Sequence, residues 1–214
     1  MPNNTTIKSI DLNKEQFISQ VLNDYRIICM SREASLLGRK EVLTGKAKFG
    51  IFGDGKELAQ LVMSKFFNKG DFRSGYYRDQ TFMMAIGELT VQEFFAGLYA
   101  HTDLEKEPNS AGRQMGGHFS TKSVDKDGNW LNLSDKKNTS SDISCTGAQM
   151  PRLVGLGLAS KIYRQNKELK DFNNFSNNGN EVAFGTIGDA STSEGVFWES
   201  MNAACVLEIP LVMS

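Results

Sequence analysis

The run VAFGTIGDASTSEGVFWESMNAACVLEIPLVM, residues 182–213, decides the fold. Residues 182–187 are short and apolar, which is typical of a buried strand. The Gly-Asp-Ala sequence at 188–190 predicts a turn, and a capping box followed by apolar residues at helical spacing predicts a helix over residues 191–204. Residues 209–213 begin a second strand. A strand–helix–strand unit of this length indicates two parallel strands, so the expected fold class is α/β, with a parallel sheet flanked by helices.

Four further helices are predicted from apolar periodicity and end signals. The first begins after Asn13, an N-cap residue, and is expected to stop at Gly38. The second spans residues 56–67, and the third begins with a capping box at residues 90–93. A fourth is expected over residues 151–164, where a proline occupies the first turn.

Between these elements, residues 109–143 form a long polar segment in which helical and strand periodicity both fail. A stretch of this length without regular structure is usually functional or mobile. We expect two units, an amino-terminal helical extension over residues 1–48 and an α/β domain over residues 49–214. Because natural domains rarely end inside a buried strand, we also expect the chain to be truncated at its carboxyl end.

Composition excludes several classes of protein. The 214 residues are 40% apolar, enough for a core, and carry 24 basic against 25 acidic residues, a net charge of −1 that argues against a nucleic-acid partner. No window approaches the roughly 20 apolar residues of a membrane span, and residues 1–8 lack the apolar run of a secretion signal. Three dispersed cysteines and two histidines suggest neither disulfides nor a zinc site. We therefore expect a cytoplasmic protein.

The turn that follows the first strand carries the chemistry. In open parallel sheets, ligands bind beyond the carboxyl ends of the strands, where helix amino termini present free N–H groups. Asp189 directly follows such a strand, so it could hold a divalent cation that in turn holds phosphate oxygens. The alternative is that Asp189 only caps the next helix, a contribution of about 1 kcal/mol.

The residues around Asp189 favour the first interpretation. GDASTSEG at residues 188–195, with Phe-Trp-Glu and Asn-Ala-Ala after it, resembles the thiamine-diphosphate motif of the 2-oxoacid dehydrogenases. In that family the motif opens with Gly-Asp-Gly and closes with Asn-Asn after a strand introduced by Pro, which Pro210 matches. The closing pair would fall beyond Ser214. The resemblance implies that Asp189 binds Mg²⁺ and that Gly188, Ala190 and Ser191 contact the cofactor, although Ala190 replaces the family's third glycine.

Three more segments resemble the same family in the same order. Tyr77 and Arg78 match its Tyr-Arg-Asp signature, in which both side chains hydrogen-bond the diphosphate, and the planar guanidinium fork suits phosphate. Residues 112–118, Gly-Arg-Gln-Met and then His118, resemble a run that borders the substrate channel, which implies a catalytic role for His118. Ser144 and Thr146 lie in a segment that contacts the cofactor. Taken singly, Arg78 could be a surface residue and His118 a hydrogen-bonded loop histidine.

Together the four segments cover roughly residues 49–214 and resemble the alpha subunit, or the alpha half of a fused chain, of a thiamine-diphosphate-dependent 2-oxoacid dehydrogenase of branched-chain or pyruvate type. The resemblance implies a partial thiamine-diphosphate-binding domain and the cofactors thiamine diphosphate and Mg²⁺. It also implies oxidative decarboxylation of a 2-oxoacid, with acyl transfer to a lipoyl-bearing group on a dihydrolipoyl acyltransferase core. A beta subunit or fused beta half would complete the site in an α2β2-type oligomer, so residues 1–214 alone are expected to be inactive. The alternatives are a non-catalytic assembly module that keeps the fold and an acetoin dehydrogenase-type alpha subunit.

Overall fold

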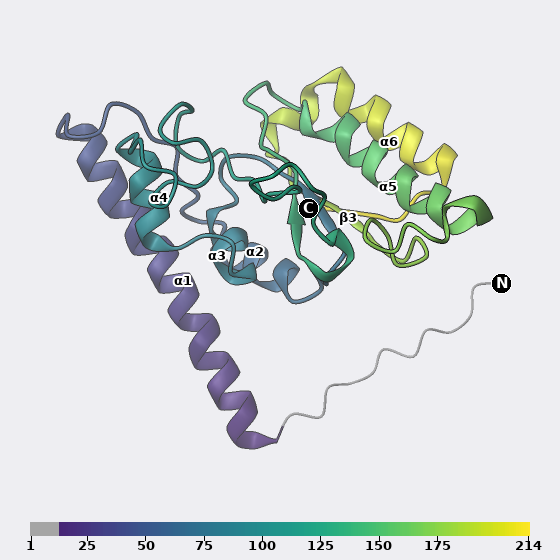
Figure 1. Ribbon diagram of the computed structural model, residues 1–214. Coiled ribbons are helices and arrows are strands. Elements are labelled where there is room, and N and C mark those ends of the chain that lie inside the picture. The colour runs from purple at the N-terminus through teal and green to yellow at the C-terminus, as the bar shows by residue number, and fades with distance from the viewer. Residues whose placement is uncertain (1–12) are drawn as a thin grey trace.

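A small parallel sheet lies between two groups of helices (Figure 1). The computed structural model describes residues 13–214, so the prediction made for residues 1–8 lies outside the described part. The strands follow the order β2-β1-β3-β4, and every neighbouring pair is parallel. Their bounds are β1 (Phe72–Ser74), β2 (Asn138–Thr139), β3 (Ala183–Gly185) and β4 (Leu211–Met213). The predicted α/β class and the parallel pairing of β3 with β4 are therefore confirmed.

Six α-helices surround the sheet in the described residues, and α1 is the long helix that extends away from the body in Figure 1. They are α1 (Lys14–Leu43), α2 (Glu57–Ser64), α3 (Gln80–Ile86), α4 (Val91–Leu98), α5 (Gln149–Gln165) and α6 (Gly195–Leu207). Short 3-10 turns occur at Leu133–Asp135, Lys167–Leu169 and Ala190–Ser193. No helix within residues 13–214 has the length and apolar character needed to cross a bilayer.

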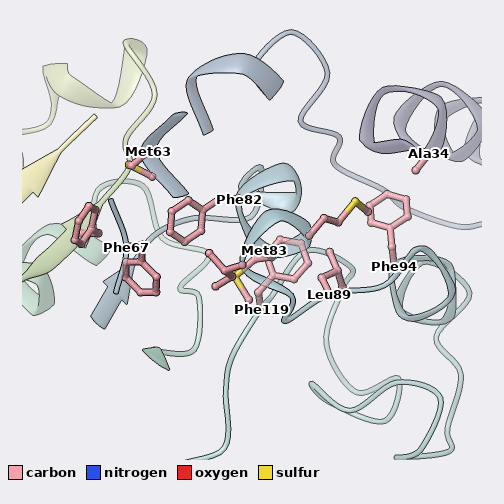
Figure 2. Packing of buried hydrophobic residues seen from close by; sticks show 11 residues of the cluster. Ala34, Met63, Phe67, Phe82, Met83, Leu89, Phe94 and Phe119 are labelled. Carbon is pink, nitrogen blue, oxygen red and sulfur yellow. The ribbon is translucent and has the colours of Figure 1, made fainter. Parts of the chain in front are cut away.

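The two faces of β3 bury two different apolar clusters, because successive side chains of a strand point to opposite faces. Phe184 joins the larger cluster, where it meets Phe67 edge to face with 5.1 Å between ring centroids. Figure 2 shows this cluster continuing through Phe82 and Met83 to Ala34 of α1. The preceding residue of β3 faces the other way and belongs to the smaller cluster. The members of the smaller cluster are Met150, Leu153, Ala183 and Phe197, from α5, β3 and α6.

The expected end of the first helix at Gly38 is wrong. Helix α1 continues to Leu43, and Gly38 is buried within it. A Cβ atom at this position would lie 2.5 Å from the ring of Phe52, so the glycine permits close packing and does not end the helix. Helix α1 shares its core with α2, α3 and α4. The domain boundary predicted between residues 48 and 49 stays a prediction.

Helix starts were predicted with mixed success. The capping boxes at Asn13 and at Thr90 are both present, with each side chain accepting a hydrogen bond from the third residue of its helix. The capping box predicted at Ser191 is absent. Residues 190–193 form a 3-10 turn instead, and Glu194 precedes α6 without a side-chain cap.

Three elements escaped the sequence analysis, namely β1, α3 and β2. Strand β2 lies inside the segment 109–143, which was expected to contain no regular structure. Its two residues, Asn138 and Thr139, are polar yet 1% and 3% exposed. A buried polar strand of this length has no apolar pattern to detect, so only its pairing with β1 reveals it.

Gly179 tests how closely the loop before β3 packs on α5. Its φ is +69°, and a Cβ atom there would overlap the carbonyl oxygen of Ser160 and lie 2.6 Å from the backbone nitrogen of Arg164. The matched control is Gly128, which has φ +85° and no atom within 4 Å of such a Cβ. We expect Gly128→Ala to lose about 1–2 kcal/mol from backbone strain alone. Gly179→Ala should lose clearly more free energy of unfolding, measured in urea. Equal losses in the two variants would show that α5 shifts to accommodate the added Cβ atom at little cost.

Candidate functional site

The loops that follow β1, β2 and β3 lie at one edge of the sheet, because all three strands run in parallel. These loops are residues 75–79, 140–144 and 186–190, and they contain most of the residues that the sequence analysis singled out. Ligands of open parallel sheets bind at this edge. The edge is therefore the place where a site can be assembled.

A buried ion cluster joins the loops. Arg73, the middle residue of β1, has no exposed side-chain surface and forms ion pairs with two equally buried carboxylates. Its Nη2 lies 2.6 Å from Oδ2 of Asp79, and its Nη1 lies 2.9 Å from Oδ1 of Asp142. The hydroxyl of Thr186, just after β3, also donates to Asp79. This cluster of Arg73, Asp79, Asp142 and Thr186, which we term the Arg73 cluster, ties three loops to one guanidinium.

The Arg73 cluster holds two carboxylates against one cation. Burial lowers the pKa of Arg73, but the adjacent carboxylates of Asp142 and Asp79 outweigh this and raise that pKa above its ordinary value. Burial also raises the pKa of Asp142, although Arg73 opposes the change. Gly75 is required beside them, because a Cβ atom there would overlap both the guanidinium and the carboxylate of Asp79.

The turn after β1 presents Tyr77 and Arg78 at this edge, both half-buried. The guanidinium carbon of Arg78 lies 5.4 Å from the centre of the Tyr77 ring. The backbone of Arg78 is held by α2, because the side chain of Gln60 donates to the Arg78 carbonyl at 2.9 Å. The backbone of this turn is thus fixed while the Arg78 side chain stays at the edge.

Tyr76 is a residue that the sequence analysis missed. It is buried, and its hydroxyl lies 4.0 Å from where a Cβ atom of Gly188 would be, so the turns after β1 and β3 are neighbours. Burial raises the pKa of this hydroxyl, and nearby Asp79 adds to the effect while Arg78 opposes it. The Tyr-Arg-Asp signature selected Tyr77, the tyrosine next to Arg78, and no local pattern in the sequence placed Tyr76 beside Gly188.

The structure brings His118 and Ser144 together across 26 residues. Nδ1 of His118 lies 2.7 Å from the carbonyl oxygen of Met115, and Nε2 lies 2.5 Å from the Ser144 hydroxyl oxygen. A carbonyl only accepts, so Nδ1 donates to it, and in the neutral ring Nε2 accepts from Ser144. The next backbone N–H, that of Phe119, donates to Asp142 at 3.2 Å and anchors the histidine loop to the Arg73 cluster. Thr146 lies nearby in sequence and is exposed.

The turn after β3 carries the remaining predicted residues. Asp189 and Ala190 are exposed, while Gly188 and Ser191 are half-buried. The backbone N–H of Ser191 donates to the Gly188 carbonyl at 3.0 Å, which closes the turn. Among residues 13–214, Ala190 is not one of those with positive φ, so alanine takes the place of the family's glycine without backbone strain.

The donor set fits a magnesium diphosphate better than a free cation. Within the part of the chain that the structure describes, no three acidic, histidine or cysteine side chains converge as a metal site. Asp189 alone offers a carboxylate at this turn. Mg²⁺ is commonly held by one or two carboxylates together with phosphate oxygens and water, and Arg78 on the neighbouring turn suits the phosphate. The residues present therefore fit one half of such a site.

A cavity of about 500 Å³ adjoins the His118–Ser144 pair. It is lined by residues 113–115 and His118, by residues 141–144, and by Arg152 of α5. It places two arginines and a histidine around a space large enough for a small organic ligand.

Arg73→Met tests the Arg73 cluster, because the change leaves Asp79 and Asp142 buried without a counter-charge. We expect a loss of about 3–5 kcal/mol in the free energy of unfolding near neutral pH. Because Arg73 opposes the effect of burial on Asp142, its removal should raise the folded-state pKa of Asp142 further. A carboxyl with a raised pKa stabilises the folded state at low pH and loses that contribution as pH rises, so the deficit should shrink on acidification.

Urea unfolding at neutral and mildly acidic pH measures this difference. The matched control is Arg39→Met, since Arg39 pairs with Asp54 and is half exposed. That surface pair should contribute at most about 1 kcal/mol, without the same dependence on pH. A deficit for Arg73→Met that is constant over this pH range would contradict the two-carboxylate description.

Comparison with known proteins agrees with this geometry. Residues 26–214 match the family model described as the dehydrogenase E1 component. The chain is 29% identical over 198 residues to the 2-oxoisovalerate dehydrogenase subunit alpha of Bacillus subtilis (strain 168). That alignment covers 90% of this chain and 49% of the relative, so the chain spans about half the relative's length. The predicted resemblance is confirmed, and the chain belongs to the dehydrogenase E1 component family.

Proposed function

We propose that this chain supplies the diphosphate- and magnesium-binding half of a thiamine-diphosphate-dependent 2-oxoacid dehydrogenase. One observation carries the proposal. The parallel sheet gathers the turn of Tyr77 and Arg78, the pair of His118 and Ser144, and the turn of Asp189 at a single edge. These are the segments whose resemblance to the family was found in sequence, and they come from distant parts of the chain.

In this proposal Arg78 and Tyr77 bind the diphosphate, and Asp189 binds the Mg²⁺ that accompanies it. The backbone of Gly188, Ala190 and Ser191 lies against the same group, and Ser144 and Thr146 contact the cofactor from the loop before α5. When bound, thiamine diphosphate supplies the electron sink that loss of carbon dioxide from a 2-oxoacid requires.

His118 has a proton-handling role in this proposal. Its Nδ1 is occupied by the Met115 carbonyl, so Nε2 is the ring atom that can exchange hydrogen bonds with a ligand. Ser144 occupies Nε2 here through its hydroxyl, and a substrate oxygen would compete for the same contact. His118 would thereby orient the substrate and hold or release a proton at Nε2.

The substrate and partners follow from the relative and stay proposals. The similarity to a subunit of 2-oxoisovalerate dehydrogenase supports a branched-chain 2-oxoacid as the substrate in preference to pyruvate. The acyl group would pass to a lipoyl arm on a dihydrolipoyl acyltransferase core. A beta subunit or fused beta half would complete the cleft in an α2β2-type assembly, with a cytoplasmic location.

The proposal is tested on the full-length enzyme with its beta partner. Turnover is measured for three substrates, 3-methyl-2-oxobutanoate, pyruvate and acetoin, with an artificial electron acceptor as the oxidant. Each assay is run in the presence and in the absence of thiamine diphosphate and Mg²⁺. We expect cofactor-dependent oxidation that is fastest with the branched acid. Preference for acetoin would indicate the acetoin dehydrogenase alternative, and failure to bind the cofactor would indicate a non-catalytic assembly module.

Arg78→Ala should weaken binding of thiamine diphosphate in the presence of Mg²⁺, because a charge-assisted contact to phosphate is lost. The expected loss is about 1.5–3 kcal/mol, the range for hydrogen bonds to charged groups, measured by calorimetry. Arg26→Ala, at an exposed position of α1, is the matched control and should leave the affinity unchanged. A loss below about 0.5 kcal/mol would return Arg78 to the class of ordinary surface residues.

Asp189→Ala should abolish the magnesium dependence of cofactor binding, because the only carboxylate on that turn is removed. Asp171→Ala alters another exposed aspartate and serves as the control. Calorimetric titrations with and without Mg²⁺ separate the two variants. The same stimulation by Mg²⁺ in Asp189→Ala as in the wild-type enzyme would rule out the assignment.

A further inference from the structure

The guanidinium of Arg152, in α5, has a hydrogen-bond partner at one nitrogen and none at another. Its Nε donates to the Ser74 hydroxyl oxygen at 3.0 Å. Its Nη2 is buried and has no hydrogen-bond partner within residues 13–214, where it is the single buried side-chain nitrogen or oxygen in that condition. A buried polar atom without a partner is costly and points to a group that is absent from the chain itself.

The anchoring of Arg152 is rigid. Ser74 is fully buried at the end of β1, and its hydroxyl donates to the carbonyl of Gln149 at 2.9 Å while it accepts from Arg152. Both the strand and the helix therefore fix where the guanidinium lies. Arg113, the other arginine at the cavity, is exposed and has no such anchor among the described hydrogen bonds.

The space beside Arg152 favours an anion. Arg152 lines the cavity of about 500 Å³ together with Arg113, His118 and Ser144. The carboxylate at this cavity, that of Asp142, already accepts from Arg73 and from the Phe119 N–H. Burial lowers the pKa of Arg152, nearby Asp142 opposes this, and the charge of Arg73 lowers that pKa further. A bound anion would offset both the burial and the repulsion.

We propose that Arg152 recognises the carboxylate of the 2-oxoacid through its free guanidinium edge. The inference rests on the proposed function and names the residue that selects an acid as substrate. The cavity borders the His118–Ser144 pair, so an acid bound to Arg152 lies beside the side chain proposed to orient its oxo group. A guanidinium offers two parallel N–H donors, which match a carboxylate and distinguish it from a neutral amide.

The test uses the holoenzyme and three variants, Arg152→Met, Arg152→Lys and the exposed control Arg26→Met. Titration with 3-methylbutanoate and with 3-methylbutanamide, two unreactive probes of similar shape, measures recognition of the charge. We expect the wild-type enzyme to prefer the acid and Arg152→Met to lose that preference. For the 2-oxoacid, Arg152→Met should raise KM by about 10- to 100-fold, the range for losing a hydrogen bond to a charged group, with a much smaller change in kcat. Arg152→Lys should fall between, since it keeps the charge without the fork.

The outcomes separate the inference from the proposed function. An unchanged acid preference in Arg152→Met, or equal weakening of both probes in Arg152→Met and Arg152→Lys, would overturn the role of Arg152. A wild-type enzyme that prefers the acid but oxidises no 2-oxoacid would support the anion site and reject the proposed function. Arg26→Met should match the wild-type enzyme in every titration, and a change there would show that the probes report general charge and overturn the assignment.

Discussion

The buried guanidinium of Arg73 is the interaction on which the rest of the site depends. It pairs with Asp79 after β1 and with Asp142 after β2, and Thr186 after β3 joins through Asp79. Removing charges from water is expensive, and a buried ion pair is often no more stabilising than apolar packing. The contribution of Arg73 is to position the loops. One planar guanidinium with several fixed N–H donors determines where the loops after β1, β2 and β3 lie relative to one another.

Two of the side chains proposed to meet the ligand adjoin residues that this cluster contains or holds. Arg78 precedes Asp79 in the turn after β1, and His118 precedes Phe119, whose N–H binds Asp142. The cluster therefore fixes the backbone on one side of Arg78 and of His118 and leaves both side chains at the edge. Such an arrangement holds reactive groups within a narrow range of positions, as catalysis and ligand binding require.

The strand that leads into the turn of Asp189 is packed on both faces by apolar clusters. Ala183 and Phe184 of β3 face opposite sides and bury separate groups of side chains, one from α5 and α6 and one shared with α1–α4. Strand β3 is thus held from both faces, and the turn of Asp189 that follows it starts from a fixed point. Arg152 approaches the same edge from α5, and its Nη2 is the one buried side-chain nitrogen or oxygen within residues 13–214 that has no hydrogen-bond partner.

The sequence by itself determined the α/β class, the helices with strong periodicity and the segments proposed for the candidate site, because these signals are local in the chain. Apolar spacing, capping residues and the GDASTSEG run need no knowledge of neighbours in space. Only the tertiary structure decided the short strands β1 and β2, the passage of α1 through Gly38 and the position of Tyr76 beside Gly188. The same holds for the Arg73–Asp142 pair, whose members are 69 residues apart. Contacts of that kind depend on which loops the parallel sheet brings to one edge, and no local pattern records that.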